Sequence, residues 1–381
     1  MSILKNVRAY LPKCGIVRAD IEYENGVITA VREADGSAPS SLPEGSLVIP
    51  GMIDQHIHAL EGVDTMDSTA AALDTMSCAL AKEGTTAFLA TTLTQSKEAL
   101  CEALSAAREY VEKGNFSGAE LIGVHLEGPF ISPKFIGAQN PDFIQRPDAE
   151  RFDEYQRAAG GLIRIVSLAP ELEGADALIE HLSKNGVSPS AGHTAAGYED
   201  MVRAVKHGLA SVTHTYNAQS GVHHREIGVV GAAMLCDELY AELICDTVHV
   251  SVPALKLMIR NKPANKVILI TDSIRPKGLP DGEFDSGGLT VYLKNGEARL
   301  ANGALAGSTL RMNYALRNLV EKVGVPLENA IDFATVNPAT HLGLAHERGT
   351  IEVGKRADFA ILNEQFDVLS TIVGGVTVYK I

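Results

Sequence analysis

Side chains of metal-binding type stand at the ends of short apolar runs in this sequence. His56 and His58 form an H-x-H pair at the end of the run 49–56. Because residues two apart on a strand face the same side, both imidazoles can reach one ion about 2.0–2.1 Å away. Taken alone, the pair fits two hydrogen-bonded histidines at a surface strand end more readily than a metal site.

Other ligand-type side chains follow other apolar runs. Glu127 precedes Gly128-Pro129, a sharp exit that would hold its carboxylate in place, and His193 and His214 each close an apolar run. Singly, these residues fit a solvated loop carboxylate and two core histidines. Together they indicate a metal site, because half of the 12 histidines lie near five such run ends, namely His56, His58, His125, His193, His214 and His249.

Asp272 ends the apolar run 267–271 and is the candidate proton carrier. Beside a metal ion, its carboxylate could accept a proton from bound water and return it to a leaving group. The alternative is a helix N-cap or a buried ion-pair partner. His125 should face the same side as Glu127 but one layer deeper, so we expect a structural role for it.

Elements of a barrel must position these residues. Between Gly51 and about Leu344, apolar runs rich in β-branched residues alternate with segments of helical period, which predicts repeated β/α units. Eight such units close a (β/α)8 TIM-like barrel, whose active site lies at the C-terminal strand ends, where the ligand-type residues stand. The expected strands are Ile49–His56, Thr85–Thr91, Leu121–His125, Ile163–Leu168, Val187–Ala191, Ser211–His214, Ala241–Asp246 and Lys266–Thr271.

The segments between these strands carry local helix signals. Ser96 is a candidate N-cap, and Leu100, Leu104 and Ala107 follow it on one helical face. A second apolar stripe from Met201 stops at Gly208, a residue suited to the left-handed position after a helix. We therefore expect helices with one apolar face between the strands.

The two ends of the chain differ from its middle. Short alternating runs broken by Asn25-Gly26 and Asp35-Gly36 predict hairpins before the barrel. We expect residues 1–50 and 346–381 to form one small β-sandwich domain, beside a hydrolase barrel of residues 51–345. Further expected strands are Asp358–Leu362 and Val373–Tyr379 in the tail, and an insertion after the eighth barrel strand around Gly288–Leu300, with a hairpin turn at Asn295-Gly296.

Composition excludes several classes of protein. The chain has 381 residues, 45% of them hydrophobic and 21% charged, which is ordinary for a folded globular protein. Its net charge of −14 repels phosphate backbones and anionic membrane surfaces, so we expect neither nucleic acid nor a membrane as a partner. The five cysteines are scattered and never spaced C-x-x-C, and no secretory leader is evident, so a cytoplasmic location is expected.

Rival chemistries lack their motifs. The sequence has no G-x-S-x-G elbow, no H-E-x-x-H helix and no G-x-G-x-x-G turn. Gly349-x4-Gly354-Lys355 imitates a phosphate loop, but Arg356 stands where Ser or Thr must bind Mg²⁺. We therefore reject a phosphate loop.

Several motifs in order resemble a known family. Pro50-Gly-Met-Ile-Asp-Gln-His-Ile-His58 and Gly354-Lys-Arg-Ala-Asp-Phe359 resemble the amidohydrolase superfamily of metal-dependent β/α-barrel hydrolases. Within it, the chain is similar to the N-acetylglucosamine-6-phosphate deacetylase family over nearly its whole length. The motifs that carry this similarity are His125-Leu-Glu-Gly-Pro-Phe130, Ala191-Gly-His-Thr194, Thr213-His-Thr-Tyr-Asn-Ala218, His224-Arg-Glu226, Leu305-Ala-Gly-Ser308 and Asn337-Pro-Ala339.

The resemblance implies roles for these residues. Glu127, His193 and His214 would bind the principal metal, Asp272 would be the catalytic acid and base, and His56 and His58 could support a second ion. The implied cofactor is thus one or two divalent ions per subunit, with zinc the first candidate and iron, cobalt or manganese as alternatives. The implied substrate is a small amino-sugar phosphate, contacted by Ala138, Gln139, Asn217, Ala218, Arg225, His249, Leu305, Ala306 and Gly307. A homodimer is also implied, in which Arg225 reaches the phosphate in the neighbouring subunit's site.

Two residues depart from the family pattern, and alternatives stay open. Gln139 stands where the family usually has a histidine that contacts the sugar, and Thr247 stands where it usually has glycine. The expected reaction is deacetylation of N-acetylglucosamine 6-phosphate. An amidohydrolase acting on a different N-acetylated hexosamine or another N-acyl substrate is the first alternative. A noncatalytic barrel scaffold is the second, and it would be indicated by missing ligands.

Overall fold

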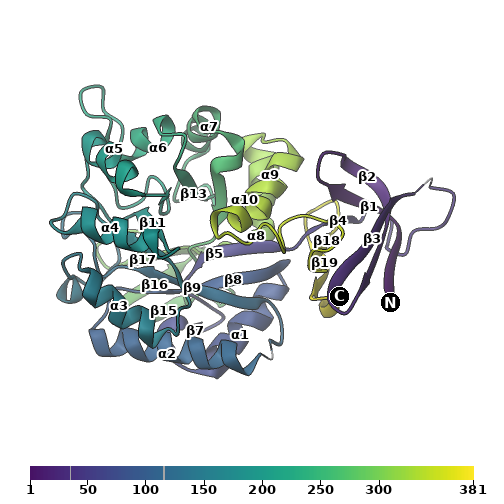
Figure 1. The fold of residues 1–381 in the computed structure, drawn as a ribbon, viewed down its shortest axis with the longest axis horizontal. Coiled ribbons are helices and arrows are strands. Elements are labelled where there is room, and N and C mark those ends of the chain that lie inside the picture. The colour runs from purple at the N-terminus through teal and green to yellow at the C-terminus, as the bar shows by residue number, and fades with distance from the viewer. Residues whose placement is uncertain (35, 115) are drawn as a thin grey trace.

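Eight parallel strands form the centre of the larger region in the computed structural model, which describes residues 1–34, 36–114 and 116–381 (Figure 1). Neighbours in the sheet follow chain order. Just after the last strand, the Asp272 amide donates to the His56 carbonyl in the first strand at 2.8 Å and joins the two. The predicted barrel is confirmed; its strands are β5 (Met52–Ile57), β8 (Thr85–Thr92), β9 (Glu120–Glu127), β10 (Ile163–Leu168), β11 (Ser188–Ala191), β12 (Ser211–Val212), β13 (Tyr240–Ile244) and β14 (Val267–Ile270).

The first predicted strand is divided in the structure. Residues Leu47–Pro50 form β4, which belongs to another sheet, and β5 begins at Met52. Between them, a Cβ on Gly51 would lie 2.0 Å from the Thr86 hydroxyl oxygen, so only glycine lets the chain pass here. One apolar run therefore serves two sheets.

Helices surround the barrel strands (Figure 1). The Ser96 hydroxyl caps α2, accepting from the Ala99 amide at 3.2 Å, and Leu100 and Leu104 are buried, as predicted. Gly208 follows α5 with φ of 111°, also as predicted. The α-helices are α1 (Ala70–Ala81), α2 (Lys97–Lys113), α3 (Ala149–Ala158), α4 (Ala175–Lys184), α5 (Tyr198–His207), α6 (Gly228–Leu235), α7 (Val252–Asn261), α8 (Met312–Asn318), α9 (Leu327–Ala334) and α10 (Val336–His341). Short 3-10 or π turns occur at Thr65–Asp67, Pro141–Phe143, Ala264–Lys266 and Leu319–Val323.

Both chain termini join one seven-stranded sheet beside the barrel (Figure 1). Its order is β20-β19-β18-β4-β1-β2-β3. Although β4 and β1 separate β18 from β2, the rings of Tyr23 and Phe359 lie 5.6 Å apart, so the sheet curls on itself around a shared apolar core. The strands besides β4 are β1 (Ser2–Leu11), β2 (Gly15–Glu24), β3 (Val27–Glu33), β18 (Phe359–Leu362), β19 (Val368–Val373) and β20 (Val376–Lys380).

The predicted turns and the predicted last strand have three outcomes. Turns at Asn25-Gly26 and Asn295-Gly296 are confirmed, and all four residues have positive φ. The single strand predicted over Val373–Tyr379 is wrong, because Gly374 and Gly375 turn the chain between β19 and β20. The turn predicted at Asp35-Gly36 includes Asp35, which lies outside the described residues.

An insertion follows the last barrel strand, as predicted. It forms a three-stranded antiparallel sheet of β15 (Gly282–Ser286), β16 (Leu289–Lys294) and β17 (Glu297–Leu300). A two-stranded ribbon of β6 (Ala59–Leu60) and β7 (Val63–Asp64) follows β5. Both lie beyond the C-terminal ends of barrel strands. Among the described helices, none has the length and apolar character that a membrane span requires.

Candidate active site

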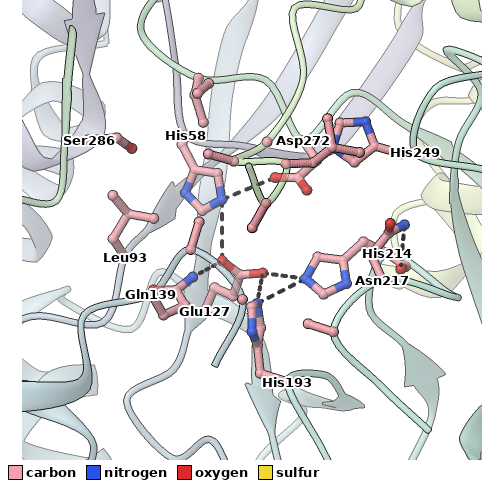
Figure 2. Close-up of a pocket in the computed structure, with 18 residues that line it drawn as sticks. His58, Leu93, Glu127, Gln139, His193, His214, Asn217, His249, Asp272 and Ser286 are labelled. Atoms are coloured by element: carbon pink, nitrogen blue, oxygen red, sulfur yellow. Dashed lines mark hydrogen bonds and ion pairs between the residues drawn. The ribbon is translucent and has the colours of Figure 1, made fainter. Parts of the chain in front are cut away.

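A cavity of about 260 Å³ lies at the C-terminal ends of the barrel strands (Figure 2). Nearly all residues that were expected to bind metal, transfer a proton or contact substrate line it. Among these, the exceptions are His56, which is fully buried, and Arg225, which lies on an exposed loop. The lining residues are His58, Leu93, Glu127, Gly137, Ala138, Gln139, His193, His214, Asn217, Ala218, His249, Asp272, Ile274, Ser286, Ala304, Leu305, Ala306 and Gly307.

Three ligand atoms converge on one side of the cavity floor. Glu127 Oε1 lies 3.0 Å from His214 Nε2 and 3.4 Å from His193 Nε2, and the two nitrogens are 3.1 Å apart. All three residues are buried. Ligands at about 2.0–2.1 Å from a tetrahedral zinc ion would be roughly 3.3 Å from one another, so this spacing suits a metal ion.

A second group lies on the other side of Glu127. Asp272 Oδ1 is 3.2 Å from His58 Nε2 and 3.5 Å from His56 Nε2. Glu127 also faces this group, with Oε2 at 3.3 Å from His58 and Oε1 at 3.3 Å from His56. The Glu127 carboxylate thus stands between the two groups, as Figure 2 shows for His58, His193 and His214.

Unpaired buried atoms support the fit to a cation. His56 Nε2 and Glu127 Oε1 are buried and lie 3.3 Å apart, but neither atom makes a well-aligned hydrogen bond among the described residues. Leaving such atoms unpaired costs about 1–3 kcal/mol each, so they call for a partner. Imidazole nitrogens and a carboxylate suit a divalent metal ion, and this donor set does not choose among zinc, iron, cobalt and manganese.

Left-handed backbone aims three of these side chains. His193, His214 and Asp272 follow their barrel strands with φ of 47°, 29° and 48°. Non-glycine residues in this region cost of order 1–3 kcal/mol, and such strain gathers at functional sites. Each strand end therefore turns sharply where it delivers a ligand-type side chain to the cavity.

The charges of the cluster decide the state of Asp272. Burial raises the pKa of its carboxyl, but His56 and His58 outweigh burial and hold that pKa below its ordinary value. The side chain is therefore an ionised carboxylate at neutral pH. His125 behaves differently, because burial lowers its pKa to about 3 and leaves it neutral between the Gln55 carbonyl and the Ser167 hydroxyl, at 3.2 and 2.7 Å.

Glu242 contacts the cluster, and the sequence patterns did not indicate it. Its carboxylate lies 3.1 Å from His56 Nδ1, accepts from the His214 amide at 3.2 Å, and accepts from Gln55 Nε2 at 2.6 Å. Because Nδ1 is hydrogen-bonded to Glu242, His56 Nε2 is left to face the Glu127 and Asp272 carboxylates. The available sequence signal was a single glutamate within the apolar run 240–244, since a charged residue in a buried strand is almost never unpaired.

The far side of the cavity carries the residues expected to contact a substrate. Asn217, Ala218 and the 305–307 loop line it, and His249 is held by Asp246, whose Oδ2 lies 2.6 Å from His249 Nδ1. Leu93, Ile274, Ala304 and Ser286 also line the cavity, and nothing in their sequence surroundings pointed to this. The cavity thus has a polar floor, and its walls contain both polar and apolar residues.

Arg225 lies apart from the cavity. Its side chain is exposed, and its Nη1 is 2.6 Å from His224 Nε2. Glu226, the next residue in the chain, does not pair with Arg225 and instead accepts from the amides of Tyr198 and Gly228, each at 3.1 Å. Within the described part of the chain, Arg225 has no carboxylate partner.

Comparisons with known proteins agree with this geometry. The model of the Amidohydrolase family matches residues 47–378. N-acetylglucosamine-6-phosphate deacetylase of Bacillus subtilis is 44% identical over 335 residues, covering 87% of this chain and 85% of that protein. N-acetylgalactosamine-6-phosphate deacetylase of Escherichia coli O157:H7 is 34% identical over 348 residues, covering 91% of each.

A solved structure extends the agreement to the fold. The crystal structure of N-acetylglucosamine-6-phosphate deacetylase from Thermotoga maritima superimposes with a TM-score of 0.92. It is 36% identical, and the match covers 100% of both chains. With its barrel, its histidine and carboxylate cluster and this matched length, the chain belongs to the amidohydrolase family.

Proposed function

We propose that the protein hydrolyses N-acetylglucosamine 6-phosphate to glucosamine 6-phosphate and acetate, as a metal-dependent deacetylase of amino-sugar catabolism. The observation that carries the proposal is the convergence of Glu127, His193 and His214 beside the ionised Asp272 in one cavity. The names of the matched relatives from Bacillus subtilis and Thermotoga maritima support the substrate. Three ligands and a base are the parts that metal-assisted amide hydrolysis requires.

Glu127, His193 and His214 would hold the principal ion, and His56, His58 and Asp272 would support a second one. A divalent ion bound there would lower the pKa of a water ligand and polarise the acetyl carbonyl. Asp272 accepts the proton of the attacking water, because its carboxylate is ionised, lies 3.2 Å from His58 Nε2 and lines the same cavity as Glu127, His193 and His214. It then returns that proton to the departing amine nitrogen, which otherwise would leave less readily than hydroxide.

The remaining cavity residues would bind the sugar. Asn217 and Ala218 offer polar and backbone groups on one wall, and His249 and the 305–307 loop face the same space. We propose that Arg225 binds the phosphate in the site of a neighbouring subunit, in a cytoplasmic homodimer. Its exposure and its lack of a carboxylate partner in the described residues support that role, since guanidinium groups grip phosphate oxygens in pairs.

A different N-acetylated hexosamine phosphate is the second candidate substrate. The Escherichia coli relative is named for N-acetylgalactosamine 6-phosphate, and Gln139 and Thr247 both lie where this chain departs from the family pattern. The two sugars differ in the configuration of one hydroxyl. Discrimination between them therefore depends on few contacts.

Metal analysis combined with acetate release tests the proposal. We expect at least one divalent ion per chain, and acetate release that is fastest from N-acetylglucosamine 6-phosphate among phosphorylated and unphosphorylated N-acetyl hexosamines. Faster release from the galactosamine epimer would favour the second candidate. Metal-loaded protein that releases acetate from none of them would overturn the proposed function.

A further inference from the structure

Gln139 uses both ends of its amide inside the protein. Its Nε2 donates to Glu127 Oε2 at 2.5 Å, and its Oε1 accepts from the Thr94 amide at 2.7 Å. The side chain is buried, and Figure 2 shows it beside Glu127 at the edge of the cavity. A residue expected to contact the sugar thus has its polar groups engaged elsewhere.

The orientation of this amide is determined by its two partners. Rotating the amide by half a turn would place its NH₂ group against the Thr94 N–H and its oxygen against the Glu127 carboxylate. Both contacts would then be repulsive, two donors at one end and two acceptors at the other. The amide therefore presents a donor to Glu127 in this position.

The surrounding loop holds Gln139 at this spot. Its backbone amide donates to the Ile136 carbonyl at 3.1 Å, closing a turn at Gly137, whose φ is 59°. A Cβ on Gly137 would lie 3.0 Å from the His193 ring, so the loop packs tightly against a ligand-type residue. Turning the amide toward a sugar would break both of its hydrogen bonds.

We propose that Gln139 is a positioning residue that fixes the Glu127 carboxylate, and that its amide does not read the sugar. Holding Oε2 leaves Oε1 aimed at His193 and His214, at 3.4 and 3.0 Å. The inference rests on the proposed metal-binding role of these three residues. Partners that orient a ligand contribute about 10- to 100-fold to metal affinity or activity.

The variant Gln139→Met tests the proposal, because methionine keeps the length of the side chain and removes both hydrogen bonds. Gln95→Met is the matched control: Gln95 is half-buried on the loop after β8, and its amide donates to the Gly287 carbonyl at 3.0 Å and accepts from the Ser96 amide at 3.1 Å. Cobalt affinity is measured for both variants and the parent by competition with a chelator, together with the visible absorption of the bound cobalt. We expect about 10- to 100-fold weaker binding and an altered spectrum for Gln139→Met only.

Kinetics on two epimeric substrates separate positioning from sugar recognition. Under the proposal, metal-saturated Gln139→Met loses kcat, while its KM and its preference between N-acetylglucosamine and N-acetylgalactosamine 6-phosphates match the parent. Unchanged cobalt affinity and spectrum, or a raised KM with a changed epimer preference, would overturn it. If Gln139→Met does not fold, Gln139→Leu serves instead, since leucine also has no group that can donate to Glu127.

Failure of the proposed function would look different. A parent protein that binds metal but deacetylates no amino sugar contradicts the substrate assignment. The cobalt affinities would still report whether Gln139 positions Glu127. Conversely, normal deacetylation with equal cobalt affinity in Gln139→Met and the parent contradicts this inference alone.

Discussion

The cavity floor and the loop carrying Arg225 differ in how completely this chain builds them. On the floor, each ligand-type side chain is buried and meets two or more partners, with Glu127 touching four histidines. On the loop, Arg225 is exposed and meets His224. The candidate metal-binding residues are therefore brought together within this chain, whereas the residue proposed to bind the phosphate lies outside the cavity of its own chain.

The physical reason lies in the barrel. Parallel strands deliver their C-terminal ends to one place, so single residues on β9, after β11 and after β12 converge without help from long loops. Arg225 lies before α6 in an irregular segment that no strand aims at the cavity. The strands of the barrel therefore bring the floor residues together, whereas no strand positions Arg225.

Removing a floor ligand should have the largest effect. His214→Ala or His193→Ala deletes one of the three proposed ligands of the principal ion, so we expect loss of that ion and activity at background. Elemental analysis after dialysis measures the metal, with His346→Ala as the exposed-histidine control. The double replacement of His56 and His58 should remove at most a second ion. Full metal content in His214→Ala would refute the ligand assignment.

Removing the base should come next. Asp272→Asn leaves the principal ligands intact but cannot accept a proton, so we expect kcat to fall by at least about 10²-fold with the principal ion retained. Steady-state acetate release and metal analysis on the same preparation check this. Turnover like that of the parent would show that Asp272 is not the base.

Arg225→Ala tests the proposed phosphate contact on the exposed loop. A hydrogen bond to a charged group contributes about 1.5–3 kcal/mol, so KM for the 6-phosphorylated sugar should rise by roughly tenfold or more, with little change for the unphosphorylated sugar. Equal losses on both sugars would contradict phosphate binding.

Mixed dimers sharpen this prediction. Heterodimers of Arg225→Ala with His214→Ala should regain part of the activity, because one site would then have a complete floor and an intact Arg225 from its neighbour. The measurement is acetate release from a co-expressed, doubly tagged preparation. Verified heterodimers without any gain would assign Arg225 to its own subunit's site.

A smaller effect is expected one layer beneath the floor. Glu242→Gln places an amide against His56 Nδ1 and removes the carboxylate that orients this ring, so metal affinity should weaken by about tenfold. Chelator competition measures it, and Glu238→Gln, an exposed carboxylate preceding the same strand, is the control. Equal affinities in the two variants would mean that Glu242 does not orient the metal-binding residues.

The smallest expected effect is the pH dependence of metal affinity, measured by adding metal to the metal-free protein. Burial lowers the pKa of His58, but hydrogen bonds with Asp272 and Glu127 outweigh it and raise that pKa to about 9. A protonated His58 repels a cation and must lose its proton to bind one, so affinity at the second group should increase as pH rises toward 9. Titrations at several pH values should show a shallower slope in His58→Gln. A slope equal to that of the parent would contradict the coupling.

Sequence patterns sufficed for much of the fold. The eight apolar runs predicted the barrel because buried parallel strands read as continuous β-branched stretches. They did not reveal that 49–56 spans two sheets, since one apolar run looks alike on either side of Gly51. Nor did they reveal that Gly374 and Gly375 turn the chain within 373–379. The division into 1–50 with 346–381 and 51–345 stays a prediction.

For the candidate site, sequence patterns were enough to identify the ligand-type side chains at the ends of the barrel strands, because the strand order and the direction of each strand follow from the β/α alternation. The contacts of each side chain became known only from the folded chain. Glu242 lies 3.1 Å from His56 Nδ1, and Gln139 Nε2 donates to Glu127 at 2.5 Å. In both pairs the partner is more than ten residues away in the chain. Arg225 remained outside the cavity because irregular loops follow no period that a sequence displays.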